Sequence, residues 1–154
     1  MAKFPTTVEK SVTIHVPIAE VYAFLWDVLV ASKCLPGIDS CTAVGNDVYE
    51  FILQERSTGP VSLVVRYNAR FEGNGTDRIA FRGIGAAQDN TDIEGEFRLK
   101  AANAGSTRVT LKQFVAPETP VPRLLQGFLK SFVESEAADT VQGYLLNLKA
   151  ELER

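Results

Sequence analysis

The chain has 154 residues, of which 45% are hydrophobic and 23% charged, and its net charge is −3. This is the composition of a folded protein, and the length is sufficient for one domain with a real core. The absence of a basic excess argues against nucleic acid as a partner, and no apolar run approaches the roughly 18–20 residues of a membrane span. The start of the chain has no apolar signal core, so we expect a single cytoplasmic domain over residues 1–154.

Few side chains are suited to binding a metal. Cys34 and Cys41 are the only cysteines and His15 is the only histidine, which does not make a zinc site. We therefore predict no metal, no cofactor and a reduced pair of half-buried thiols. His15 falls on the polar face of an alternating stretch and has no carboxylate or nucleophile in the local pattern, so a surface role is favoured over a catalytic one.

The first elements in chain order are a strand and two short helices. Residues 6–16 alternate between apolar and polar, which is typical of a half-buried strand. Pro17 ends this strand and begins a short helix over residues 18–28, with one apolar side. A second short helical piece is predicted over residues 29–35, and it stops at the turn dipeptide Pro36-Gly37.

Six further strands are predicted in hairpins separated by glycine-containing turns or loops. They cover residues 39–44, 48–56, 61–72, the region of Ile79 and Phe81, residues 93–100 and residues 107–116. Sequential hairpins give an antiparallel meander, and a sheet of about seven strongly twisted strands curls. Polar residues alternate with the apolar ones, so each strand has one inward face.

The last stretch, from Val121 to Arg154, predicts one long helix with Pro122 in its first turn. Its apolar residues form two stripes on nearly opposite faces. The first stripe is Val121, Leu125, Phe128, Leu129 and Phe132; the second is Ala137, Val141, Tyr144, Leu145, Leu148 and Leu152. The helix must therefore bend near residues 134–139 or expose its first stripe, which is a candidate surface for a protein partner, a homodimer or a membrane. The second half is the better candidate for the core.

The inward faces of the strands suggest a cavity between the sheet and the long helix. An apolar lining with a few polar groups is the usual make-up of a small-molecule site, and inward glycines such as Gly83, Gly85 and Gly95 leave room for a ligand or for close packing. The candidate ligand-binding residues are Phe51, Leu53, Tyr67, Phe81, Gly83, Phe97, Leu111, Gln113, Phe128 and Phe132. The alternative is a closed core filled by the aromatic side chains.

Two acidic residues fall at inward positions, Glu55 and Glu136. A carboxylate enclosed in an apolar pocket can act as an acid or a base, so both are candidates for that role. Glu55 lies beside a turn and Glu136 beside the expected bend, which favours solvated or hydrogen-bonded structural roles. No nucleophile–base pair, zinc-protease motif or phosphate-binding loop is present, and we assign no catalytic residue.

The element order resembles the helix-grip fold of the START-type lipid-transfer and polyketide-cyclase superfamily, also called SRPBCC. The stretch from Val16 to Asp27, followed by Cys34-Leu35-Pro36-Gly37, resembles the CoxG-like family within it, whose members are associated with carbon monoxide dehydrogenase. Tyr22 stands where that family usually has tryptophan, and the Gly59-Pro60-Val61 turn is also similar.

The resemblance implies an α+β fold in which a curved antiparallel sheet wraps around the C-terminal helix. It also implies a binding or carrier domain for a lipid, quinone or polycyclic molecule, accessory to a molybdenum-hydroxylase system. The alternative that it implies is a cyclase or dehydratase, in which Glu55, Tyr67 or Gln113 positions a substrate carbonyl and moves a proton.

Overall fold

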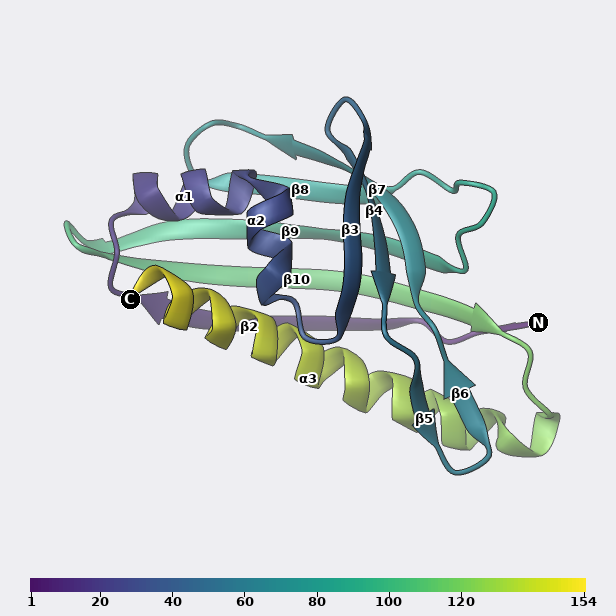
Figure 1. The fold of residues 1–154 in the computed structure, drawn as a ribbon. Coiled ribbons are helices and arrows are strands. Elements are labelled where there is room, and N and C mark those ends of the chain that lie inside the picture. Colours follow the sequence, from purple (N-terminus) through teal and green to yellow (C-terminus); the bar gives the residue numbers. More distant parts are fainter.

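A computed structural model describes residues 1–154 and has an α+β helix-grip fold, as predicted (Figure 1). The helices are α1 (Ile18–Trp26), α2 (Val28–Ala31) and α3 (Gln126–Leu152), with single 3₁₀ turns at Ser32–Cys34 and Arg123–Leu125. The strands are β1 (Ala2–Lys3), β2 (Thr6–Ile14), β3 (Ile38–Gly45), β4 (Val48–Leu53), β5 (Arg56–Thr58), β6 (Val61–Leu63), β7 (Arg66–Gly73), β8 (Arg78–Gly83), β9 (Thr91–Asn103) and β10 (Ser106–Thr119).

The main sheet is antiparallel throughout, and β3, β4, β7, β8, β9 and β10 follow one another across it as the predicted meander. The N-terminal strand β2 closes the far edge by pairing with β10, where Val12 lies opposite Val109. The short strand β1 continues this edge along the end of β10. All three helices pack on the same face of the sheet, so the core lies between that face and the helices.

The hairpin predicted over residues 48–72 is bent rather than straight. Each of its two strands divides, into β4 and β5 and into β6 and β7, and the backbone N–H of Leu53 still donates to the carbonyl of Val65 at the bend. The tip, β5–β6, forms a separate two-stranded sheet that reaches across the first half of α3 (Figure 1). The bend buries Val61 and Leu63 against the helix, which a straight hairpin would leave in solvent.

A row of aromatic rings in contact with one another crosses the core under the main sheet. It runs Tyr67, Phe51, Phe71, Phe81, Phe97 and Tyr144, with neighbouring ring centroids between 5.0 and 6.1 Å apart. These separations lie in the range that aromatic pairs prefer. This part of the inward face of the sheet is therefore a closed core. It corresponds to the alternative to a ligand cavity that the sequence analysis named.

The long helix α3 is uninterrupted through residues 134–139, so the first of the two alternatives, a break in the helix there, does not occur. Its buried residues are Leu129, Val133, Ala137, Val141, Leu145 and Leu148. Each four-residue step advances about 40° around the axis, so the buried face turns by about 160° between Leu129 and Leu145. The rotation explains the two opposite stripes in the sequence: the first half packs against the β5–β6 tip and Phe4, and the second half packs against the main sheet.

Part of the first stripe remains exposed. Phe128 of this stripe is 48% exposed, and Leu124, in the 3₁₀ turn just before the helix, is 95% exposed. The partner or homodimer surface predicted for this half-helix remains a prediction. None of the helices is both long and apolar enough to cross a membrane.

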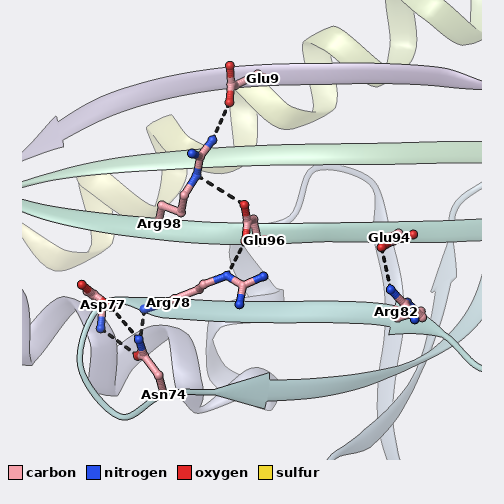
Figure 2. A network of polar contacts seen from close by, with 8 residues as sticks. All are labelled: Glu9, Asn74, Asp77, Arg78, Arg82, Glu94, Glu96 and Arg98. Carbon is pink, nitrogen blue, oxygen red and sulfur yellow. Dashed lines mark hydrogen bonds and ion pairs between the residues drawn. The ribbon is translucent and has the colours of Figure 1, made fainter.

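The outer face of the sheet carries a ladder of ion pairs. Arg98 bridges Glu9 on β2 and Glu96 on β9, Arg78 also bonds to Glu96, and Arg82 pairs with Glu94 at 2.9 Å (Figure 2). Most of these side chains are well exposed, and exposed pairs each contribute only about 0–1 kcal/mol. This face is a solvated surface that keeps the polar side of the meander in water.

Candidate functional site

The candidate site is a cavity of about 80 Å³ between the bend of the 48–72 hairpin, β9, β10 and the middle of α3. Its walls are mostly apolar, and the residues that line it are Leu35, Leu53, Gln54, Arg56, Leu63, Val65, Tyr67, Ile93, Gln113, Val115, Pro117, Val133, Glu136, Ala137 and Thr140. The cavity exists because the aromatic row ends at Tyr67, while the helix continues toward the β5–β6 tip. It therefore separates the two hydrophobic clusters of the molecule.

The charged residues of the lining form one ion pair at the mouth of the cavity. Arg56 Nη1 donates to Glu136 Oε2 at 3.0 Å, and the side chains are 40% and 30% exposed. Arg56 begins β5 and Glu136 lies on α3, so the pair joins the hairpin tip to the helix across the opening. A half-exposed pair of this kind stabilises by no more than about 1 kcal/mol, so it is a weak closure.

Gly37 determines where the Arg56 side chain lies. Gly37 has φ +75°, and a Cβ at this position would collide with the Arg56 guanidinium. The left-handed backbone is what requires the glycine; the guanidinium, at the end of a flexible side chain, occupies the space that the missing Cβ leaves. The backbone N–H of Gln54 also donates to the Gly37 carbonyl at 2.7 Å, which holds the bend of the hairpin against this turn.

The Cys34-Leu35-Pro36-Gly37 turn is fixed on α3 and places Leu35 in the cavity wall. The Asn147 side-chain amide donates to the Cys34 carbonyl at 2.9 Å. A Cβ at Gly143 would lie only 2.8 Å from Pro36 Cγ, so the glycine allows the turn to approach the helix closely. Both cysteines are free thiols, as predicted.

The polar groups inside the cavity are hydrogen-bond donors or neutral amides. Burial raises the pKa of Tyr67 well above its usual value, and the neighbouring Cys41 raises it further, so the phenol stays protonated near neutral pH. Gln113 and Thr140 complete the uncharged polar lining. No group of three or more His, Cys, Asp or Glu side chains is placed to hold a metal ion.

The structure brings together only some of the residues predicted from the sequence. Leu53, Tyr67, Gln113 and Glu136 line the cavity. Phe51, Phe81, Phe97 and Leu111 lie in the main core, because the aromatic rings stack on one another and leave no space there. Phe132 packs in the second cluster, Phe128 is half exposed, and Gly83 lies at the end of β8 and lines the outer hollow of the sheet.

The inward position predicted for Glu55 is wrong. The alternation of β4 is interrupted at residues 54–55, so Glu55 is exposed and Arg56 reaches the cavity instead. Gln54, Arg56, Val133 and Thr140 also line the cavity and were not among the residues predicted to do so. A usable signal for Arg56 was the short run from Gln54 to Pro60, which has turn residues and no apolar side chain to hold a straight strand.

An open groove of about 590 Å³ on the outer face of the sheet is larger than this cavity. Exposed charged residues such as Arg70, Glu72 and Lys112 edge it, together with the ion pairs of Figure 2. An open groove between solvated charges buries little ligand surface. The smaller cavity, which is apolar and enclosed on several sides, is the better candidate.

Comparisons with known proteins agree with the fold. A family model described as polyketide cyclase/dehydrase and lipid transport matches residues 5–153. A protein from Thermus thermophilus has a similar structure with a TM-score of 0.72, at 17% identity over 96% of this chain and 97% of the other. No curated protein sequence matches the chain significantly.

Two further solved structures are similar over almost their whole length. The Zhui aromatase/cyclase from Streptomyces sp. R1128 has a TM-score of 0.68 and 20% identity, with 97% of this chain and 94% of the other covered. A START superfamily protein from Mycobacterium smegmatis has a TM-score of 0.67 and 17% identity, with 96% and 97% covered. At these identities the likeness establishes the helix-grip fold and nothing finer.

Proposed function

Because the chain belongs to the polyketide cyclase/dehydrase and lipid transport family, we propose that it binds a small hydrophobic ligand in the cavity between the sheet and α3. The observation that carries this proposal is an apolar cavity in the core beyond the end of the aromatic row, between the sheet and α3. Its few polar groups, among them Tyr67 and Gln113, lie where they can orient a ligand.

Binding requires the β5–β6 tip to move. The cavity volume of about 80 Å³ is far below the roughly 300–1,000 Å³ of pockets that hold drug-sized ligands. The tip belongs to its own two-stranded sheet and is joined across the mouth by the weak Arg56–Glu136 pair. Moving it away from α3 enlarges the cavity without breaking the main sheet, and the ligand then replaces the apolar contacts of Val61 and Leu63.

A fluorescence titration with the neutral dye N-phenyl-1-naphthylamine tests this function. We expect saturable binding to the wild type, because the dye is an apolar two-ring body that gains fluorescence when it leaves water. Thr140→Phe fills the cavity from the helix and should weaken binding about tenfold or more, whereas Thr140→Val keeps the volume and should not. No saturable binding to the wild type, or equal binding by both variants, would contradict the proposal.

A second candidate function is a cyclase- or dehydratase-type enzyme, and the observation that favours it is that Glu136, Tyr67 and Gln113 line the same cavity. Tyr67 and Gln113 would hold a substrate carbonyl, and Glu136 would transfer the proton after leaving Arg56. Glu55 has no place in this reaction, because it is exposed. The candidate requires that Glu136→Gln abolish conversion of a poly-β-ketone probe while binding of the neutral dye is retained.

The resemblance of Cys34-Leu35-Pro36-Gly37 to the CoxG-like family suggests a finer assignment. We propose a quinone- or lipid-type ligand and a cytoplasmic accessory role beside a molybdenum hydroxylase of the carbon monoxide dehydrogenase type. The two free thiols agree with a reducing compartment. Mass spectrometry of the freshly purified native protein tests the ligand, because a bound quinone or lipid adds a defined mass, and its absence from every preparation would count against this assignment.

A further inference from the structure

We infer that the ligand carries an anionic group, and that this group binds the Arg56 guanidinium in competition with Glu136. The inference rests on the proposed function, because it concerns the same cavity. The family assignment leaves the ligand open. The inference gives its chemical class: an apolar body with one carboxylate, sulfonate or similar anion.

The charges of the cavity lining are the first observation. Arg56 is its only cationic residue and Glu136 its only anionic one, and both lie at the mouth. An amphiphile bound here therefore has its apolar body inside and its head group beside this pair. Tyr67, whose phenol stays protonated, and the Gln113 amide are further hydrogen-bond donors of the lining, so acceptor groups on the ligand's body can be bound as well.

The donors of Arg56 are the second observation. A guanidinium has five N–H groups, and in this molecule only Nη1 donates to a protein acceptor, the Glu136 carboxylate. The guanidinium lies over Gly37, where the missing Cβ leaves space for it, and its other N–H groups donate to no protein acceptor. An incoming carboxylate or sulfonate can take two parallel donors, a geometry stronger than the single bond to Glu136.

The exchange also explains how binding opens the cavity. The Arg56–Glu136 pair connects the β5–β6 tip to α3, so a head group that replaces Glu136 releases the tip from the helix. Arg56 keeps an anionic partner throughout. Glu136 is already 30% exposed, so its carboxylate becomes solvated when it leaves Arg56, with a small free-energy cost. A neutral ligand must open the same mouth with the pair intact.

The test compares two dyes that differ by one sulfonate, neutral N-phenyl-1-naphthylamine and anionic 8-anilino-1-naphthalenesulfonate. In the wild type we expect the anionic dye to bind about tenfold more tightly, the difference that a charge-assisted hydrogen bond gives. Arg56→Gln should remove this preference, and the neutral dye should bind this variant at least as tightly as the wild type, because the ion pair that closes the mouth is gone. Glu136→Gln should strengthen the anionic dye about threefold or more, because the competitor is gone. Arg108→Gln, an exposed cation with no ion pair, is the matched control and should change neither.

The remaining outcomes distinguish a failure of this inference from a failure of the proposed function. If the neutral dye binds but Arg56→Gln leaves the preference intact, or Glu136→Gln weakens the anionic dye, the inference is wrong and the proposed function stands. If Arg56→Gln weakens both dyes equally, Arg56 only supports the mouth and the inference is also wrong. If neither dye binds the wild type, the proposed function itself fails.

Discussion

At the scale of single residues, three glycines leave space that neighbouring groups occupy. Gly37 provides the space for the guanidinium of Arg56, Gly143 allows the Pro36 turn to approach α3, and Gly95 lies beneath the ring of Phe81. The sequence suggested that inward glycines leave either a void for a ligand or room for close packing. At Gly95 the second holds, because the aromatic neighbour on β8 occupies the space.

Gly95→Ala is expected to destabilise the protein by about 1–3 kcal/mol, the usual cost of overpacking a filled core. The added Cβ would lie 2.5 Å from Phe81 Cζ and 2.7 Å from the Lys112 carbonyl oxygen, and the second neighbour is backbone that cannot turn aside. Urea denaturation measures the change. Gly105→Ala in the β9–β10 turn, where the nearest atom is 3.8 Å away, is the control and should stay within about 0.5 kcal/mol. Equal losses in both variants would show that the Phe81 contact is unimportant.

At the scale of elements, α3 is one continuous helix with two packing environments. Its buried face rotates steadily, so a straight helix meets the main sheet with its second half and the β5–β6 tip with its first. The bent hairpin covers the first half of the helix, because it brings apolar residues to the side of the helix that the main sheet does not reach. The cavity lies where one environment gives way to the other.

Leu129→Ala is expected to cost about 2–5 kcal/mol, because Leu129 is fully buried under the β5–β6 tip and its truncation leaves a hole. Leu124→Ala, just before the same helix, is the matched control. Leu124 is 95% exposed, so its truncation should change the free energy of unfolding by less than about 0.5 kcal/mol. Thermal or urea unfolding distinguishes the two. A small effect at Leu129 would mean that the tip does not pack on the helix in solution.

At the scale of the whole molecule, the phenols of Tyr67, which is buried, and Tyr144, which is half-buried, lie in one core. Burial raises the pKa of both Tyr67 and Tyr144, and their mutual proximity raises that of Tyr144 further. The unfolded chain binds fewer protons than the folded one once the pH exceeds the ordinary tyrosine pKa of about 10. The stabilisation is therefore complete below pH 10 and is lost as the pH rises toward the higher folded pKa values.

Alkaline unfolding measures this effect. The wild type should lose stability steeply above about pH 10, and Tyr67→Phe, which keeps the ring stacked on Phe51, should reduce the slope. Absorbance of ionised tyrosine should appear for Tyr67 and Tyr144 only as the protein unfolds. An unchanged slope in Tyr67→Phe, or ionisation of all four tyrosines in the folded state, would contradict the burial of these phenols.

The sequence by itself determined the order of the elements, the meander and the long C-terminal helix, because alternation, helical periodicity and turn residues are local properties. It also identified Leu53, Tyr67, Gln113 and Glu136, whose positions follow from an uninterrupted alternation or from the helix. The remaining features depend on how distant parts of the chain pack together. The bend at residues 54–55 exchanged Glu55 for Arg56, the stacking of aromatic rings turned most of the expected ligand face into closed core, and the hairpin tip covered the first half of α3 without a bend in the helix. These outcomes depend on which surfaces meet across long sequence separations, and a strand or helix pattern fixes the face of a residue but not the partner that covers it.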